Sequence, residues 1–264
     1  MIDLHTHLLP DWDDGAKDWD DLAKMIEIAQ ADGVRKIGLA PHLYRLNKYD
    51  SDIPLLKLKL AQFKLKTAGC PVLFYEGTEV FIHHEIIPAL RDHGLTVNGS
   101  NYFFIEFPSE YVLPGVKDFF FNIRRAGFIP IISHPERNAG FQDRPELLAD
   151  LIKMGCLAQV TAKSLTGSFG PLVKKTAEMF VARNLVHLIA SDAHDPVRRP
   201  PVLSKGVEEA RKIVGDKKAV AMVTSIPQAI LDNQAIGDWG EPVLPAKEKK
   251  WSVKLPSVRR KKAY

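Results

Sequence analysis

The chain begins Met1-Ile2-Asp3-Leu4-His5-Thr6-His7-Leu8-Leu9-Pro10, and this stretch decides how the rest of the sequence is interpreted. Its first residues form a short apolar run of the kind that becomes a buried strand, and two histidines stand at the end of the run. Because side chains alternate between the two faces of a strand, His5 and His7 are expected on the same side of the backbone. The stretch therefore predicts a buried strand that ends in a pair of metal ligands.

Short apolar runs recur along the chain with amphipathic stretches between them, as in repeated β/α units around a parallel sheet. Seven strands are predicted, at residues 2–5, 36–40, 72–76, 102–106, 129–133, 157–160 and 186–190. Apolar residues spaced three and four apart predict helices at 19–31, 53–67, 115–126, 145–154, 171–183 and 202–214. A chain of 264 residues without an internal repeat fits one α/β barrel domain, which is placed at residues 1–244.

Candidate metal ligands lie at or just beyond the carboxyl ends of the predicted strands. These ends meet at one face of a parallel barrel, where catalytic side chains collect. The candidates are His5, His7, His42, Glu79, Glu106, His134, Asp192 and His194. A lone histidine at a strand end is more often a hydrogen-bonded structural residue, so the prediction depends on the whole set. So many buried charges would be costly without cations, and the set therefore predicts a centre with several divalent ions.

The ligand types also indicate which ions and which reaction to expect. A mixture of imidazoles and carboxylates suits Mn, Fe, Zn or Co better than Ca. Such ions lower the pKa of water and polarise the bond under attack, so hydrolysis is predicted. The other histidines lack a position at a strand end and are interpreted as surface or packing residues, and they are His83, His84, His93 and His187.

Two arginines beside the candidate ligands indicate a phosphate ester as the substrate, because guanidinium groups match phosphate oxygens. Arg137 follows His134 in Ser-His-Pro-Glu-Arg, and Arg199 follows Asp192-Ala193-His194. A surface ion pair is the alternative for each of them. Arg198 competes with Arg199, but Arg199 precedes a rigid pair of prolines and is the better-fixed candidate.

Two carboxylates near the N-terminus, Asp13 and Asp14, precede Gly15-Ala16. Asp14 is predicted to be catalytic, either by orienting a ligand histidine or by donating a proton to the leaving oxygen. Asp13 has the same options with less support. Turn chemistry before the first helix is the alternative for both, since Asp-Gly is typical of turns.

Charge is concentrated at the C-terminal end of the chain. The formal net charge is +4, and residues 245–264 contain Lys247, Lys249, Lys250, Lys254, Arg259, Arg260, Lys261 and Lys262. The rest is nearly neutral, which argues against a nucleic-acid groove across the barrel. The tail is expected to be flexible, although it could touch phosphates or an acidic membrane surface. No apolar run approaches the roughly 20 residues that span a bilayer, and the opening leaves no room for a signal peptide, so a cytoplasmic location is expected.

Several motifs, in this order and spacing, resemble a known family. They are His5-Thr6-His7-Leu8-Leu9-Pro10, Asp13-Asp14-Gly15-Ala16, Ala40-Pro41-His42, Gly77-Thr78-Glu79, Ile105-Glu106-Phe107-Pro108, Ser133-His134-Pro135-Glu136-Arg137, Ser191-Asp192-Ala193-His194 and the segment 159–170. From residue 1 to about residue 235 the chain is similar to the PHP-superfamily bacterial protein-tyrosine phosphatases of capsule and exopolysaccharide loci, the CpsB, CapC and YwqE group.

The resemblance implies a distorted (β/α)7 barrel of the PHP type with three divalent ions, usually manganese. It implies removal of phosphate from tyrosines of a partner kinase that regulates polysaccharide export. The eight candidates would be the ligands, and Arg137 and Arg199 would bind the phosphate. Some relatives have an arginine shortly after the third-strand glutamate, where this chain has Phe81. This departure concerns the rim of the substrate pocket and not the candidate metal ligands.

Two other functions are compatible with these residues. One is hydrolysis of a small metabolite such as histidinol phosphate, or of nucleic acid, since related barrels do both. The other is a regulatory protein that binds phosphotyrosine or components of polysaccharide export without catalysis. The intact set of candidate ligands argues against the second.

Overall fold

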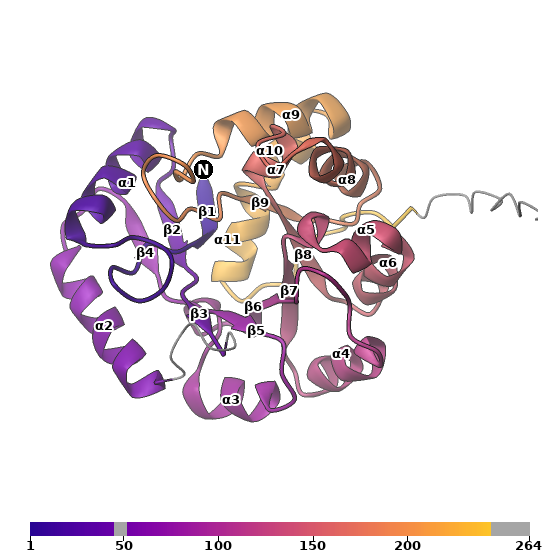
Figure 1. The fold of residues 1–264 in the computed structure, drawn as a ribbon, viewed down its shortest axis with the longest axis horizontal. Helices are drawn as coiled ribbons and strands as arrows, with labels where there is room; N and C mark the ends of the chain where they lie inside the picture. The colour runs from indigo at the N-terminus through magenta and orange to yellow at the C-terminus, as the bar shows by residue number, and fades with distance from the viewer. Residues whose placement is uncertain (45–51, 244–264) are drawn as a thin grey trace, which may run out of the picture.

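Parallel strands enclose a common interior, and helices cover the outside (Figure 1). The computed structural model describes residues 1–44 and 52–243, so the predicted tail at 245–264 lies outside the described residues. One sheet has the order β1 (Ile2–Thr6), β2 (Lys36–Leu39) and β4 (Leu73–Tyr75). The other has the order β3 (His42–Leu43), β5 (Glu79–Phe81), β6 (Tyr102–Glu106), β7 (Ile129–Ser133), β8 (Leu157–Thr161) and β9 (Leu188–Ala190). The prediction of a distorted α/β barrel is confirmed.

Two predicted strands are each split into two segments, and this split distorts the barrel. The strand predicted at 36–40 resumes beyond Pro41 as β3, and the strand predicted at 72–76 resumes beyond Gly77 as β5. A Cβ atom on Gly77 would lie 2.9 Å from the main-chain oxygen of Leu39, closer than real Cβ atoms come. β2 pairs with β4 in one sheet, and β3 pairs with β5 in the other. His42 and Glu79 therefore lie at the first residues of β3 and β5, and not just beyond the end of a strand as the sequence indicated.

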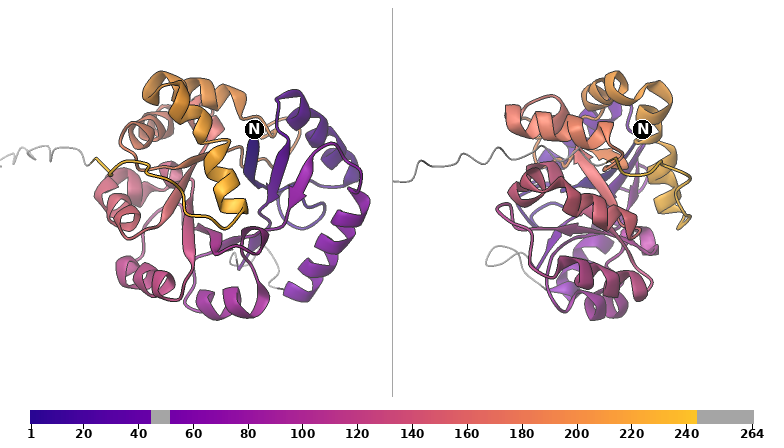
Figure 2. Two further views of the ribbon diagram at one scale, coloured as in Figure 1. Left: turned by 180° about the vertical axis from the view of Figure 1, so that it is seen from behind. Right: turned by 90° about the vertical axis from the view of Figure 1, so that its right-hand side faces the viewer.

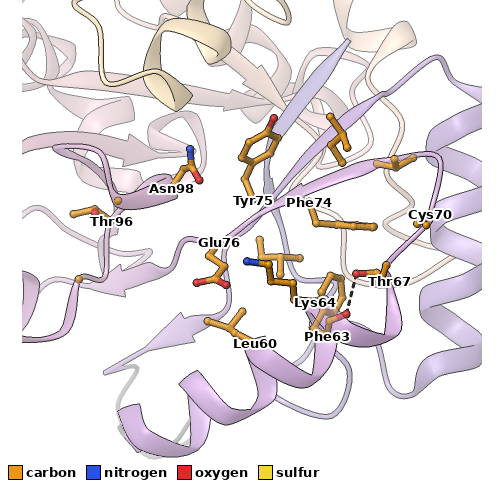
Figure 3. Close-up of a pocket in the computed structure, with 17 residues that line it drawn as sticks. Leu60, Phe63, Lys64, Thr67, Cys70, Phe74, Tyr75, Glu76, Thr96 and Asn98 are labelled. Atoms are coloured by element: carbon orange, nitrogen blue, oxygen red, sulfur yellow. Dashed lines mark hydrogen bonds between the residues drawn. The ribbon is translucent and has the colours of Figure 1, made fainter.

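The two sheets meet where the first and last strands lie side by side. The main-chain N–H of Asp192 donates to the oxygen of His5 at 2.9 Å, and that of His7 donates to Ala193 at 2.8 Å. At the opposite limit of the first sheet, β4 is the edge strand. A cavity of about 620 Å³ lies beside it, and Tyr75, Glu76 and Asn98 are among its lining residues (Figure 3). Its lining includes none of the candidate ligands or arginines, so this cavity is separate from the predicted site.

The helices agree with the predicted ones to within a few residues and add several short ones. The predicted helices correspond to α1 (Trp19–Ala31), α2 (Ile53–Lys66), α4 (Val116–Arg125), α6 (Pro145–Lys153), α8 (Pro171–Ala182) and α9 (Ser204–Val214). The sequence did not indicate α3 (Ile86–His93), α5 (Ala139–Asp143), α7 (Ala162–Leu165), α10 (Asp216–Ala221) or α11 (Ser225–Leu231). No helix in the described ranges is both long enough and apolar enough to span a bilayer.

The interior of the barrel is apolar at one end and polar at the other. At the end where the strands begin, α11 lies across the opening (Figure 2). Ile226 and Ile230 of this helix belong to the same buried cluster as Leu4 and Phe104 from the strands. The interior is thus filled and covered at this end, which leaves the carboxyl ends of the strands as the place for polar side chains.

An irregularity in β1 turns the first histidines into the barrel. The pairing of β1 with β2 shifts register between Asp3 and Thr6. Leu4 packs in the inner cluster with Phe104, yet the ring of the adjacent His5 also faces Phe104, with 4.8 Å between ring centroids. Neighbouring residues of a regular strand would point to opposite faces. A register shift of this kind re-aims side chains, and here it allows His5 to follow Leu4 into the interior.

Candidate metal centre

All eight predicted ligands lie together at the carboxyl ends of the strands. The ligand atoms of His5, His7, Glu79 and Asp192 face one small volume. The Nε2 atoms of His5 and His7 are 3.2 Å apart. Glu79 Oε2 lies 3.4 and 3.6 Å from these two nitrogens. Asp192 Oδ1 lies 3.7 and 3.4 Å from the same two atoms. Side chains from three separate parts of the chain therefore direct lone pairs at the same small volume.

Glu79 occupies the middle of the cluster. His42 Nδ1 lies 3.1 Å from Glu79 Oε2 and 3.6 Å from Glu106 Oε2. His134 Nε2 lies 3.4 Å from Glu79 Oε1. Among the described residues neither carboxylate oxygen of Glu79 accepts a hydrogen bond, although the side chain is fully buried. A buried carboxylate without such bonds is unfavourable, so the arrangement fits cations that would lie between Glu79 and the imidazoles.

Three overlapping groups in the described ranges have ligand atoms within 4.8 Å of one another. They are His5, His7 and Asp192; His42, Glu79 and Glu106; and His7, Asp14, His42 and His194. Asp14, predicted to be catalytic, has Oδ1 at 3.4 Å from the Nε2 atoms of both His42 and His194. His134 contacts Glu79 but belongs to none of the three groups.

Burial and neighbouring charges shift the pKa values of three histidines in the cluster. Burial lowers the pKa of His7, but the attraction of Asp13 outweighs this effect and raises that pKa to about 10. Burial and His7 lower the pKa of His42, yet the carboxylates of Asp14 and Glu79 raise it to about 9. Burial and Arg137 together lower the pKa of His134 to about 4. Cations that bind to this cluster would release the protons held by His7 and His42.

The two predicted arginines converge on one carboxylate oxygen. Arg137 Nη1 lies 2.5 Å from Asp192 Oδ2, and Arg199 Nη2 donates to the same oxygen. Burial raises the pKa of Asp192, but the two guanidinium groups hold it well below its usual range. The arginine side chains are 28% and 23% exposed, so both can contact a molecule that arrives from solvent. The competing Arg198 is exposed, and its main-chain oxygen accepts a hydrogen bond from Lys163.

Two further residues hold the imidazoles of candidate ligands in place. Asp13 Oδ2 lies 2.9 Å from His7 Nδ1 and accepts the main-chain N–H of His42 at 3.0 Å. Gln159 Oε1 lies 3.1 Å from His5 Nδ1. Each contact occupies Nδ1 and so leaves Nε2 directed at the cluster. Sequence reasoning gave Asp13 less support than Asp14 and assigned Gln159 no role, although an amide within the apolar strand β8 was an available signal.

The four histidines that were interpreted as surface or packing residues belong to none of the three groups of potential ligand atoms. The ring of His83 packs on Tyr44, with 4.3 Å between centroids, while His84 and His93 are exposed. His187 is buried, and its Nδ1 accepts the main-chain N–H of Ala158 at 3.2 Å. These interpretations are confirmed.

Comparison with known proteins identifies the family. The family described as capsular polysaccharide synthesis, CpsB/CapC, matches residues 1–232. CapC of Staphylococcus aureus is 34% identical over 256 residues, which cover 95% of this chain and 98% of that protein. The tyrosine-protein phosphatase YwqE of Bacillus subtilis is 32% identical over 253 residues, which cover 95% of this chain and 98% of that protein.

Solved structures agree with this assignment. A crystal structure from work on YwqE of Bacillus subtilis and CpsB of Streptococcus pneumoniae, described as metal-dependent tyrosine phosphatases, matches with a TM-score of 0.84 and 32% identity. The match covers 93% of this chain and 100% of that one. A histidinol phosphate phosphatase from Lactococcus lactis matches with a TM-score of 0.52 at 12% identity, over 82% of this chain and 93% of that one, which is a likeness of fold. The chain belongs to the CpsB/CapC family of capsular polysaccharide synthesis.

Proposed function

We propose that this protein is a metal-dependent phosphatase that hydrolyses phosphotyrosine in a partner protein. The observation that supports this most is the position of the two guanidinium groups. Arg137 and Arg199 share an oxygen of Asp192, whose other oxygen faces the imidazoles of His5 and His7. The carboxylate of Asp192 thus joins the two arginines proposed to bind phosphate to the imidazoles proposed to bind metal ions. The tyrosine phosphatases among the relatives agree with this function.

We infer that the eight candidate ligands hold three divalent ions, with manganese first and iron, zinc or cobalt as alternatives. The three overlapping groups of ligand atoms support this number. The mixture of imidazole nitrogen and carboxylate oxygen supports these metals over calcium. Bound ions would supply Lewis acidity, which lowers the pKa of water and offsets negative charge on the phosphoryl group.

The protein's own residues orient and neutralise the substrate. Arg137 and Arg199 bind the non-bridging phosphate oxygens, and their contacts with Asp192 fix both guanidinium groups before the substrate arrives. Asp14 remains a proposed catalytic residue. Its Oδ1 atom lies 3.4 Å from the Nε2 atoms of both His42 and His194, within the same group of potential ligand atoms, so Asp14 adjoins the place where the ions would bind.

The proposed substrate is a tyrosine-phosphorylated protein, in particular a bacterial tyrosine kinase of polysaccharide export. The description of the family as one of capsular polysaccharide synthesis supports this partner. The side chain of Asp14 is 37% exposed and those of the two arginines about a quarter, so this edge of the centre is open to solvent. A phosphotyrosine side chain on a protein could reach it there.

The test measures the activity of the purified full chain on three substrates. The metal content of the protein is determined first. We expect phosphate release from a tyrosine-phosphorylated peptide to exceed that from histidinol phosphate, with no cleavage of single-stranded DNA. A chelator should abolish this activity, and added Mn²⁺ should restore it. Glu79→Gln should also abolish it, whereas His93→Gln, on the exposed end of α3, should not. Turnover of histidinol phosphate alone would contradict the proposal.

A further inference from the structure

An aromatic side chain stands beside one of the proposed phosphate-binding arginines. The guanidinium carbon of Arg137 lies 5.0 Å from the centroid of the Phe169 ring. Phe169 is half-buried and belongs to neither of the two apolar clusters of the barrel. It lies between Gly167 and Gly170, whose positive φ angles of 86° and 95° form a tight turn. The ring is thus presented at the arginine and does not contribute to the core.

Hydrogen bonds hold the segment that contains Phe169 against the residues that precede both arginines in the sequence. Glu136 Oε1, next to Arg137 in the sequence, accepts the hydroxyl of Ser164 at 2.6 Å and the N–H of Thr161 at 3.0 Å. Lys163 Nζ donates to the main-chain oxygen of the residue before Arg199. The segment 161–170 is therefore fixed to the two places that supply the proposed phosphate-binding groups.

We propose that the Phe169 ring is the surface against which the phenyl ring of phosphotyrosine packs, so that this residue selects aryl phosphates. The inference rests on the proposed function. In a phenyl phosphate a single oxygen joins the ring to phosphorus, so a phosphate held by Arg137 brings the ring close to the aromatic side chain on that arginine. Aromatic pairs attract one another in offset or edge-to-face arrangements.

A purely structural role for Phe169 gives a different expectation. A ring over a guanidinium group attracts it and can hold Arg137 in place. Loss of that contact would weaken the binding of every phosphate equally, including inorganic phosphate, which has no aromatic ring. The two roles therefore differ in whether substrate and inorganic phosphate are affected together.

The test measures the KM for phosphotyrosine and the inhibition constant for inorganic phosphate in the same full-length protein. For Phe169→Leu we expect the KM to rise about three- to tenfold, and the inhibition constant, which reports only the lost contact with Arg137, to rise by a smaller factor. Phe169→Tyr, which keeps the ring, should behave like the wild type. Phe121→Leu is the matched control, because this phenylalanine is 55% exposed on α4. Metal content and thermal melting confirm that each variant is intact, and Phe169→Met replaces the leucine variant if that one does not fold.

Two results would overturn the inference. An equal rise of both constants would assign Phe169 to the support of Arg137, and an unchanged KM would show that the ring does not contact the substrate. Failure of the proposed function is distinct and appears earlier. In that case the wild type itself would release no phosphate from phosphotyrosine, whatever residue stands at position 169.

Discussion

The carboxylate of Asp13 contacts two candidate ligands, one that follows β1 and one in β3. It contacts the ring of His7 and the main-chain nitrogen of His42, and its second oxygen accepts the N–H of Gly15 at 2.9 Å. Asp13→Ala leaves His7 free to turn, so we expect the affinity for Mn²⁺ to fall about 10- to 100-fold. Competition with a chelator measures this affinity. Asp20→Ala, which removes an exposed carboxylate from α1, is the control. Unchanged affinity in Asp13→Ala would mean that other contacts fix the imidazole.

Two adjacent arginines provide a matched test of phosphate binding. Arg199 donates to Asp192, whereas Arg198 is exposed and supplies a main-chain oxygen to Lys163. Removing a donor that neutralises charge in the transition state typically lowers the rate about 100-fold. We therefore expect Arg199→Ala to lower kcat/KM for a phosphotyrosine peptide by about that factor, and Arg198→Ala to leave it near the wild type. Equal losses in the two variants would argue against the assignment.

At this scale the sequence indicated which residues gather but not how they are oriented. The candidate ligands were recognisable because charged residues after buried strands meet at one face of a parallel barrel. The contact of Gln159 with His5 depends on the register shift in β1, which the alternation of side chains does not reveal. Likewise, the sharing of one Asp192 oxygen by two arginines depends on loop geometry that has no periodic pattern.

At the scale of elements, strands with long apolar runs were the most predictable. The strands at 102–106 and 129–133 have the predicted bounds. The splits at Pro41 and Gly77 were not expected, because they depend on the approach of one strand to another and not on a local pattern. Helices such as α10 and α11 span too few residues for a helical period to stand out. The apolar residues of α11 are explained by its position across the end of the barrel, which no local pattern encodes.

The close approach of Gly77 to β2 predicts that a larger residue at this position destabilises the fold. An added methyl group would meet the main-chain oxygen of Leu39 at 2.9 Å, so Gly77→Ala must push β2 and β4 apart. We expect a loss of about 1–3 kcal/mol in the free energy of unfolding, measured with denaturant. Weaker metal binding should accompany it, because Glu79 follows two residues later. Gly237→Ala, with nothing within 4 Å of the new methyl group, should be nearly neutral. Equal stability of the two variants would show that the strand crossing is not tight.

At the scale of the whole molecule, the buried His187 should make the free energy of unfolding depend on pH. Burial and the nearby Lys218 lower the pKa of His187 to about 3, against 6.5 in an unfolded chain. Between these values the unfolded chain binds the proton and the folded protein does not, so stability is complete above pH 6.5 and falls as the pH is lowered. The contribution of this residue is about 1.4 kcal/mol per pH unit.

Replacing His187 separates its contribution from the protonation of the candidate metal ligands. His187→Asn retains an acceptor for the N–H of Ala158 but does not titrate. We expect the variant to be less stable at pH 7.5 and to lose less stability than the wild type between pH 6.5 and pH 4.5, as measured by denaturant unfolding at each pH. Parallel pH profiles would contradict a neutral, buried His187.

The central claim is that side chains from distant strands form one centre shared by several cations. Anomalous diffraction at the manganese absorption edge, from crystals of the full chain grown with Mn²⁺, tests it most directly. The expected result is a group of peaks enclosed by the imidazoles of His5, His7, His42, His134 and His194 and by the carboxylates of Glu79, Glu106 and Asp192. Absence of a peak within this cluster, in protein that hydrolyses phosphotyrosine, would contradict the account.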